Sequence, residues 1–177
     1  MNINIRAEGE RILLRSFDSS LITNTYLSWF HDRKVNQYLM EQGARTTLDD
    51  IRVYVESLQK SGEDKFLAVF FKQNEKHIGN VRIGPIDSVT KKCRYGMLIG
   101  DTDYHGKGIG TEVVKVASEI CFNTLGMQKI YLEVFENNYA AVRIYEKNKF
   151  ITEGLLQKHK KLNGVYQNIR IMSLFNI

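Results

Sequence analysis

The chain has 177 residues, with 25 lysines and arginines against 20 aspartates and glutamates and a net charge of +5. This length fits one ordinary domain, so we expect residues 1–177 to form a single domain. Hydrophobic residues make up 43% of the chain, which excludes an intrinsically disordered protein. The longest apolar run, residues 66–71, is too short to cross a membrane, and the start of the chain lacks the apolar stretch of a signal peptide. We therefore expect a cytoplasmic protein without a membrane partner.

The basic excess is regional and does not indicate nucleic-acid binding. Residues 138–177 carry seven basic and two acidic groups, whereas residues 101–137 carry three and six. The densest basic piece, residues 158–161, lies beside a hairpin signal, and a solvated hairpin face explains it. Cys93 and Cys121 form no CxxC motif, so we expect reduced thiols and no metal site.

The first third of the chain predicts one strand and two helical segments. Residues 11–17 have the composition of a strand, and Asp18 or Ser19 then offers an N-cap for a helix. Apolar residues continue at helical spacing as far as Leu39, and Gly43 breaks the pattern. Thr46 is predicted to cap the next helix, with Asp49 as a capping-box partner.

The remaining elements alternate between the two periods. Three β-prone runs joined by short turns predict an antiparallel meander, at residues 65–71, 78–83 and 93–100. A helix from Ile109 should stop near Gly126, where a left-handed residue is favoured. A strand, a short helix and a final hairpin follow, at residues 129–135, residues 140–147 and around Asn163-Gly164. This order predicts an α+β domain with a mixed sheet.

The segment richest in chemistry is Tyr-His-Gly-Lys-Gly-Ile-Gly-Thr at residues 104–111. It follows a predicted strand and opens an amphipathic helix. Glycines let a ligand approach the backbone, and the unpaired amides at a helix start attract phosphate. The glycine spacing matches neither the P-loop nor the dinucleotide-binding fingerprint. Taken alone, a glycine-rich turn is equally compatible with a structural role.

Two motifs resemble those of the GCN5-related N-acetyltransferases (GNAT). Residues 105–110 resemble the family's [Q/R]-x-x-G-x-[G/A] signature, and residues 138–147 resemble its N-x-x-A-x-x-x-Y-E-K segment. The run at residues 108–112 and the tail at 163–166 resemble the ribosomal-protein, polyamine and aminosugar branch. The resemblance implies a mostly antiparallel twisted sheet of about seven strands, splayed between the fourth and fifth and flanked by helices. It also implies an enzyme that uses acetyl-CoA and no metal.

The resemblance further implies where acetyl-CoA binds. The backbone of one strand end would pair with the pantetheine arm like an added strand, through Leu98, Ile99 and Gly100. The next turn would hold the pyrophosphate, through His105, Gly106, Lys107, Gly108, Ile109, Gly110 and Thr111. Asn138 would contact the pantetheine arm or cap a helix, or do both. Lys147 either reaches the CoA phosphates or is a solvated helix residue.

Two residues are candidates for the proton transfers. Tyr145 matches the family tyrosine that protonates the departing thiolate, although a packed aromatic is the alternative. The attacking amine must lose a proton, and Glu133 matches the glutamate that serves as base in ribosomal-protein N-terminal acetyltransferases. The alternative for Glu133 is an ordinary strand carboxylate, and Glu112 and Asp101 are fallback carboxylates.

Three residues depart from the family pattern. His105 replaces a glutamine or arginine, which should matter little because the cradle binds through backbone amides. Lys149 replaces a glycine that usually precedes a phenylalanine. Arg94 stands where many relatives carry a glutamate, so Glu133 is weighed as the base instead.

The acceptor is expected to be a small molecule that carries an amine and an anionic group. A polyamine enzyme would need carboxylates at its acceptor site, whereas this chain offers basic residues near residues 31–34, at Arg45 and at 158–161. Residues 26–39 also resemble aminosugar acetyltransferases, which suggests a nucleotide-linked aminosugar attacked in a ternary complex. The alternatives are polyamine or ribosomal-protein N-terminal acetylation, or a non-catalytic domain that binds acetyl-CoA. Exposed strand edges suggest a homodimer.

Overall fold

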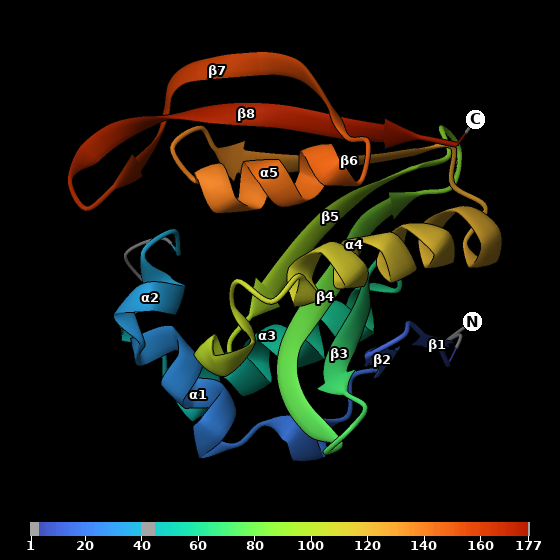
Figure 1. The fold of residues 1–177 in the computed structure, drawn as a ribbon, viewed down its shortest axis with the longest axis vertical. Helices are drawn as coiled ribbons and strands as arrows, with labels where there is room; N and C mark the ends of the chain where they lie inside the picture. Colours follow the sequence, from blue (N-terminus) through green and yellow to red (C-terminus); the bar gives the residue numbers. More distant parts are fainter. Residues whose placement is uncertain (1–3, 40–44, 177) are drawn as a thin grey trace.

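The structure, a computed structural model, describes residues 4–39 and 45–176. Its strands join in one sheet in the order β1-β2-β3-β4-β5-β6-β8-β7 (Figure 1). The strands are β1 (Arg6–Glu8), β2 (Ile12–Ser16), β3 (Lys65–Phe71), β4 (Lys76–Asp87), β5 (Lys92–Ile99), β6 (Lys129–Phe135), β7 (Ile151–Leu162) and β8 (Val165–Phe175). The helices are η1 (Ser19–Leu21), α1 (Asn24–His31), α2 (Arg33–Asn36), α3 (Leu48–Ser61), η3 (Thr102–Tyr104), α4 (Ile109–Glu119), the π-helical η4 (Ile120–Thr124) and α5 (Tyr139–Lys147).

The sheet confirms the predicted α+β class and contains one strand more than the seven expected. The additional strand is β1, whose three residues pair with β2. Three residues are too few to produce a readable alternation of polar and apolar side chains, so the pattern could not reveal this strand. Every neighbouring pair is antiparallel except β5 and β6.

The sheet is splayed between β5 and β6, the predicted fourth and fifth strands. These two strands pair only from Lys92–Arg94 to Lys129–Tyr131. Beyond Arg94, β5 continues to pair with β4, and β6 continues to pair with β8. The edge of β5 from Tyr95 to Ile99 therefore has no partner strand on its β6 side among the described residues.

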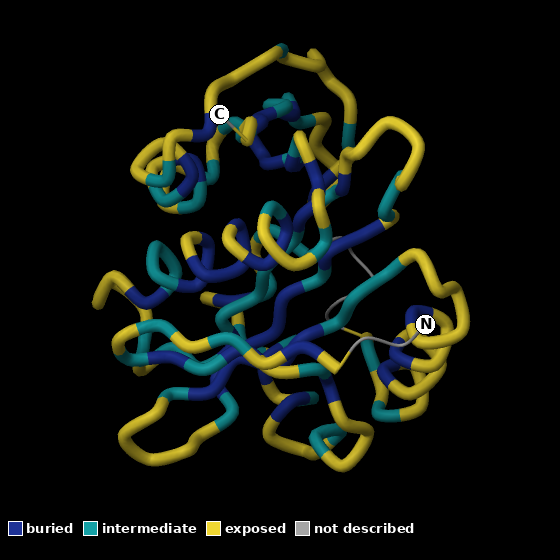
Figure 2. Tube along the Cα trace, turned by 90° about the vertical axis from the view of Figure 1, so that its right-hand side faces the viewer, coloured by how far each residue is buried: buried dark blue, intermediate teal, exposed yellow. Residues whose placement is uncertain are grey.

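Helices cover both faces of the sheet because alternate strand residues point to opposite sides. On β3, Leu67 and Val69 join the core that contains α4 and α5, while Ala68 and Phe70 join the core under α1 and α3. Figure 2 shows the buried trace running through the middle of the molecule, with exposed loops around it. The glycine-rich turn consequently lies on the α4 face of the sheet.

The first helical segment is interrupted rather than continuous as predicted. Asp18 caps only the short η1, and Thr23 caps α1. Asp32 then adopts an extended conformation and caps α2 through the Lys34 amide, which separates α1 from α2. A short polar side chain that accepts from a backbone amide competes with helix continuation, which apolar spacing alone does not reveal.

The second helix begins one residue later than predicted. Thr47 and Asp50 form the capping box of α3, in place of Thr46 and Asp49. The apolar spacing predicts a buried face made of Leu48, Ile51, Val55 and Leu58. The last three are buried, whereas Leu48 is only half-buried. The predicted break at Gly43 lies outside the described residues.

Backbone conformations agree with the residues found there at two turns and disagree at a third. Gly126 is left-handed with a φ of 67°, as predicted for a helix stop, and Asn163 and Gly164 both have positive φ in the tight β7–β8 hairpin. Lys149 has a φ of 65°. The family's glycine would adopt this left-handed conformation without strain, whereas a lysine does so at a cost.

No helix of the described chain is long and apolar enough to cross a membrane. Cys93 and Cys121 are free and buried, and the thiols lie close enough to hydrogen-bond.

Candidate active site

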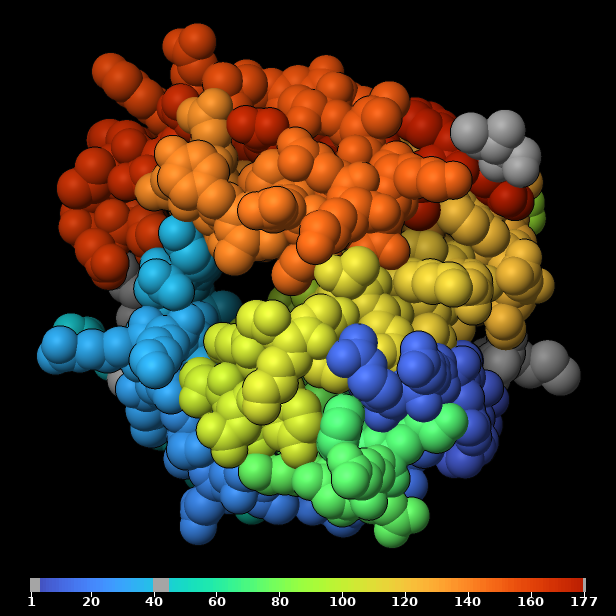
Figure 3. Space-filling model, in the orientation of Figure 1, coloured from blue at the N-terminus to red at the C-terminus, as the bar shows by residue number. Residues whose placement is uncertain are grey.

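A cleft of about 810 Å³ opens where β5 and β6 diverge. The space-filling view shows the hollow between the α2 segment (residues 33–39), the turn before α4 and α5 (Figure 3). On one side the lining comes from the turn before α4, the start of α4, and α5. We call this the helix side. On the other side the lining comes from the α2 segment, from Glu133 and Phe135 of β6, and from Lys160 of β7. We call this the hairpin side.

The two sides correspond to the two faces of the sheet. Leu132 and Val134 of β6 pack in the core under α4 and α5, together with Tyr145. Phe135 packs in a separate cluster with Leu162, Ile169 and Tyr38. Glu133 alternates with Leu132 and Val134 and therefore points to the hairpin side. The cleft is therefore lined by residues from both faces of the sheet.

The turn before α4 forms an anion cradle on the helix side. Gly106 and Gly108 have φ values of 71° and 77°, and Gly108 is the N-cap of α4. The backbone amides of residues 106–111 donate no hydrogen bond within the described part of the chain. The next amide along the chain, that of Glu112, donates to the Gly108 carbonyl. Free amides at a helix start suit a phosphate group. The cradle therefore fits the pyrophosphate of CoA.

Arg11, the residue just before β2, supports the cradle, and the sequence reasoning missed it. Arg11 Nη1 donates to the Lys107 carbonyl at 2.9 Å, and its Nε pairs with Glu112 Oε2 at 2.9 Å. Glu112 also accepts from the Arg11 and Ile12 amides. No local motif could reveal a contact about a hundred residues apart in sequence.

Neither fallback carboxylate lines the cleft. Glu112 ties α4 to β2, as described above. Asp101 pairs with Lys76 at 2.7 Å and accepts from the Asp103 amide. Both groups have structural partners, which leaves Glu133 as the carboxylate of the described lining. Within the described ranges, no cluster of three or more His, Cys, Asp or Glu could hold a metal ion.

The predicted cofactor residues lie around the helix side, with two exceptions. The cleft is lined by Leu98, Ile99, His105, Gly106, Gly108, Ile109, Gly110, Thr111, Asn138 and Lys147. Gly100 does not line it. The Trp29 ring packs against Gly100 so closely that a side chain there would collide with the indole. Lys107 contributes its carbonyl to Arg11 instead. The resemblance could not foresee either role.

His105 holds the end of β5 in place. Its Nε2 lies 2.8 Å from the Ile99 carbonyl oxygen and donates to it. Its own amide bonds to the Thr102 carbonyl. The His105 side chain thus connects the strand end to the cradle, and the Ile99 carbonyl already has one partner.

Asn138 and Lys147 lie at the two ends of α5. The Asn138 side chain accepts from the Ala141 amide at 3.2 Å, which makes it the N-cap of the helix. Lys147 occupies the last turn of α5. Both residues line the cleft. Because Asn138 caps the helix through its side-chain oxygen, its side-chain amide nitrogen is available to a ligand.

Tyr145 lies on α5 with its ring buried and packed between aromatic neighbours. The ring lies 5.5 Å from Phe150 and 6.2 Å from Tyr95, both measured between ring centroids. Burial raises the pKa of the Tyr145 hydroxyl above its ordinary value. The hydroxyl therefore stays protonated at neutral pH, as a proton donor requires.

Glu133 lies between two cations on the hairpin side. Its Oε2 is 2.6 Å from Lys160 Nζ and 3.1 Å from Arg94 Nη2. Although partial burial opposes it, the hydrogen bond from Lys160 and the charges of Lys160 and Arg94 lower the pKa of Glu133. Glu133 is therefore ionised at neutral pH. Both cations make their ion-pair contact with Oε2, and no described residue donates a hydrogen bond to Oε1.

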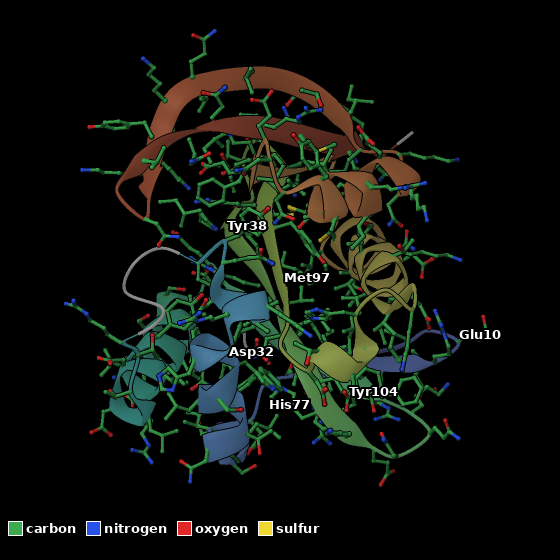
Figure 4. The ribbon with its side chains drawn as sticks, turned by 60° about the vertical axis from the view of Figure 1, so that its left-hand side comes forward. Glu10, Asp32, Tyr38, His77, Met97 and Tyr104 are labelled. Atoms are coloured by element: carbon green, nitrogen blue, oxygen red, sulfur yellow. The ribbon has the colours of Figure 1, made fainter. Side chains whose placement is uncertain are left out.

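Tyr38 connects the α2 segment to the far half of the sheet. Its hydroxyl donates to the Asn137 carbonyl at 3.0 Å, and its ring lies 5.9 Å from that of Phe135. Figure 4 shows Tyr38 at the end of the α2 segment that approaches the β6–β8 half, and Met97 on β5. Both residues line the cleft. The sequence placed Tyr38 in a helix and did not reveal this bridge.

Known proteins with the same architecture are N-acetyltransferases. The chain is 27% identical over 145 residues to spermidine N(1)-acetyltransferase of Escherichia coli K12, covering 82% of this chain and 76% of that protein. It is 27% identical over 143 residues to the probable N-acetyltransferase YjcK of Bacillus subtilis, covering 81% and 77%. The crystal structure of spermidine N-acetyltransferase from Vibrio cholerae with CoA and spermine superposes with a TM-score of 0.85 at 23% identity, covering 94% of this chain and 96% of that one.

The family model of the acetyltransferase (GNAT) domain matches residues 11–151, from the strand that supports the cradle to the start of β7. That span contains the free amides, the splayed strands and the buried tyrosine described above. The chain belongs to the GNAT family and is an N-acetyltransferase that takes its acetyl group from acetyl-CoA.

Proposed function

We propose that the enzyme acetylates the amine of a small acceptor that also carries an anionic group, of which a nucleotide-linked aminosugar is one example. The observation that carries this proposal is the charge of the hairpin side. Lys34 and Lys160 line it, and Glu133 is the carboxylate of the described lining. Glu133 is already paired with Lys160 and Arg94. A surface with this charge attracts a carboxylate or phosphate more strongly than a polycation.

The proposed reaction is direct attack in a ternary complex. The cradle amides and the open edge of β5 hold acetyl-CoA on the helix side, and the acceptor enters from the hairpin side. The acceptor nitrogen bonds to the acetyl carbon, the carbon–sulfur bond breaks, and the Tyr145 hydroxyl donates its proton to the sulfur. Glu133 Oε1 takes the proton of the amine, through a water where the two do not touch. The low pKa of Glu133 makes it a weak base that stays ionised, which suits a relayed transfer.

Acetylation of a polyamine is the second candidate. It is supported by the names of the E. coli and V. cholerae relatives. In this case Glu133 Oε1 would bind an ammonium group of the acceptor. Lys160 and Arg94 would then oppose acceptor binding by like-charge repulsion.

One variant distinguishes the two candidate functions, because they predict changes in kcat/KM in opposite directions. Lys160→Gln removes a cation 2.6 Å from Glu133. For an anionic acceptor we expect kcat/KM to fall about tenfold, the value of one charge-assisted contact. For a polyamine we expect kcat/KM to rise. The assay measures release of free CoA with nucleotide-linked aminosugars, polyamines and N-terminal peptides as acceptors.

A matched control is Lys158→Gln, which removes a lysine of the same exposed strand that does not line the cleft. Its kcat/KM should equal that of the unmodified enzyme. Turnover with polyamines alone, increased by Lys160→Gln, would overturn the proposed anionic acceptor in favour of the second candidate.

A further inference from the structure

A second tyrosine in the cleft has a feature that its packing does not explain. Tyr95 of β5 is 4% exposed, and its ring lines the cleft beside Tyr145. Its hydroxyl oxygen is buried and has no hydrogen-bond partner among the described residues. Buried hydroxyl groups in folded proteins are nearly always hydrogen-bonded, because an unpaired one is costly. A phenylalanine would fill the same space without that cost. The presence of a tyrosine at position 95 therefore calls for a functional explanation.

The position of Tyr95 relative to Tyr145 suggests a functional explanation for the Tyr95 hydroxyl. The two rings are nearly perpendicular, with an interplanar angle of 88° and a centroid separation of 6.2 Å. Edge-to-face contact of this kind fixes the plane of a neighbouring ring. The Tyr145 hydroxyl forms no hydrogen bond within the described chain, so the orientation of the ring depends on packing against Tyr95 on one side and Phe150 on the other.

The titratable groups of the described chain that act on the Tyr95 hydroxyl are Tyr145 and Cys121. Burial, together with nearby Tyr145 and Cys121, raises the pKa of Tyr95 well above its ordinary value. The hydroxyl therefore keeps its proton and can donate it in a hydrogen bond. The group in this region that becomes a strong acceptor during the reaction is the oxygen of Tyr145 after it has given up its proton.

We propose that Tyr95 is a positioning residue for Tyr145, and this rests on the proposed role of Tyr145 as proton donor. When the nitrogen–carbon bond forms and the carbon–sulfur bond breaks, the proton of the Tyr145 hydroxyl passes to the sulfur. The Tyr145 oxygen is left with a negative charge, and the Tyr95 O–H donates a hydrogen bond to it. The Tyr95 ring holds Tyr145 in the plane that makes this possible. Tyr95 itself touches neither the acetyl group nor the acceptor.

The test uses Tyr95→Phe, which keeps the ring and removes the hydroxyl. We expect kcat to fall about tenfold, because a hydrogen bond to a charged oxygen is lost, while the KM for acetyl-CoA stays unchanged. The thermal unfolding midpoint should stay the same or rise, because an unpaired buried hydroxyl is gone. Tyr95→Leu also removes the ring contact and should lower kcat further. The control Tyr54→Phe removes a hydroxyl from α3, outside the cleft lining, and should leave kcat unchanged.

A double-mutant cycle shows whether Tyr95 acts through Tyr145. In the Tyr145→Phe background, Tyr95→Phe should cause no further loss of kcat, since the oxygen it would serve is absent. Equal losses in both backgrounds, or an unchanged kcat for Tyr95→Phe alone, overturn the inference. Failure of the proposed acid role looks different, because Tyr145→Phe by itself would then keep full turnover.

Discussion

At Tyr145, burial and packing leave a protonated hydroxyl beside a cleft. The ring is held by Phe150 and Tyr95, and burial raises the pKa of the hydroxyl. Glu133, on the opposite face of the sheet, is held ionised by Lys160 and Arg94. The two groups proposed to move protons thus have opposite protonation states at neutral pH. This is the arrangement that an acid and a base on either side of a reacting bond require.

The variant Tyr145→Phe should lower kcat about a hundredfold, the usual contribution of a general acid. The KM for acetyl-CoA and the unfolding midpoint should stay unchanged, because the hydroxyl makes no hydrogen bond within the described residues. Steady-state rates of CoA release and thermal denaturation measure these three quantities. A higher KM at unchanged kcat would instead assign the hydroxyl to binding of acetyl-CoA.

At the scale of elements, the cradle depends on a strand from the other end of the chain. Helix α4 presents its free amides only because Gly106 and Gly108 adopt left-handed conformations. Arg11 then fixes the turn by bonding both the Lys107 carbonyl and Glu112 in the first turn of α4. Shape and support of the cradle therefore come from two separate parts of the sequence.

Arg11→Gln should raise the KM for acetyl-CoA about fivefold while kcat stays nearly constant. The reason is that a loosened cradle weakens binding of the ground state and the transition state equally. Initial rates at varied acetyl-CoA provide the measurement. Arg6→Gln is the matched control, since Arg6 pairs with Glu8 on β1 and does not line the cleft. Equal effects of the two variants would show that Arg11 has no specific role at the cradle.

At the scale of the whole molecule, one half-buried histidine links stability to pH. His77 of β4 lies among the aromatic rings of the α1 core, namely Phe17, Tyr26, Trp29 and Phe70. Its Nε2 donates to Asn80 Oδ1 at 2.9 Å. Burial lowers the pKa of His77, and nearby Arg15 adds to the effect. The folded protein therefore binds a proton at this site less readily than the unfolded chain.

The free energy of unfolding should consequently fall as the pH falls below about 6.5, where the unfolded histidine takes up its proton. Above that pH, His77 is neutral in both states and contributes no pH dependence. Between pH 7 and pH 5.5 we expect a loss of about 1 kcal/mol from this residue, measured by urea denaturation. His77→Gln should flatten that part of the curve, whereas His159→Gln, at an exposed position on β7, should not. An unchanged slope in His77→Gln contradicts the prediction.

Local signals predicted most elements because each acts over a few residues. The Asn163-Gly164 pair, the glycine stop at Gly126 and the Asn138 cap all have the predicted conformations. Errors arose where neighbouring residues offered equivalent signals. Thr46 and Thr47 are adjacent, and so are Asp49 and Asp50, so a one-residue shift of the capping box could not be read from the pattern.

The residues of the candidate site also fall into two groups, those in local motifs and those that act through contacts between distant segments. Gly106, Gly108 and Tyr145, which line the cleft, could be proposed from the sequence because they belong to short motifs with fixed spacing. Arg11, Tyr38 and Tyr95 were missed because each matters through a contact with a distant segment. Gly100 was assigned to the cofactor, yet the structure shows Trp29 packed against it. Close packing between elements has no local sequence signature.

The sequence by itself determined the α+β class, the positions of the two GNAT motifs and the basic character of the C-terminal segment, since periodicity, spacing and charge are properties of a linear string. Only the tertiary structure decided which charges meet and which remain open. It pairs Glu133 with Arg94 and Lys160, and it gives Glu112 to Arg11. It also packs the Tyr95 ring against Tyr145 and buries the Tyr95 hydroxyl, which has no hydrogen-bond partner among the described residues. The physical reason is that ion pairs and ring contacts depend on distances through space. At this site those distances follow from the way β5 and β6 diverge.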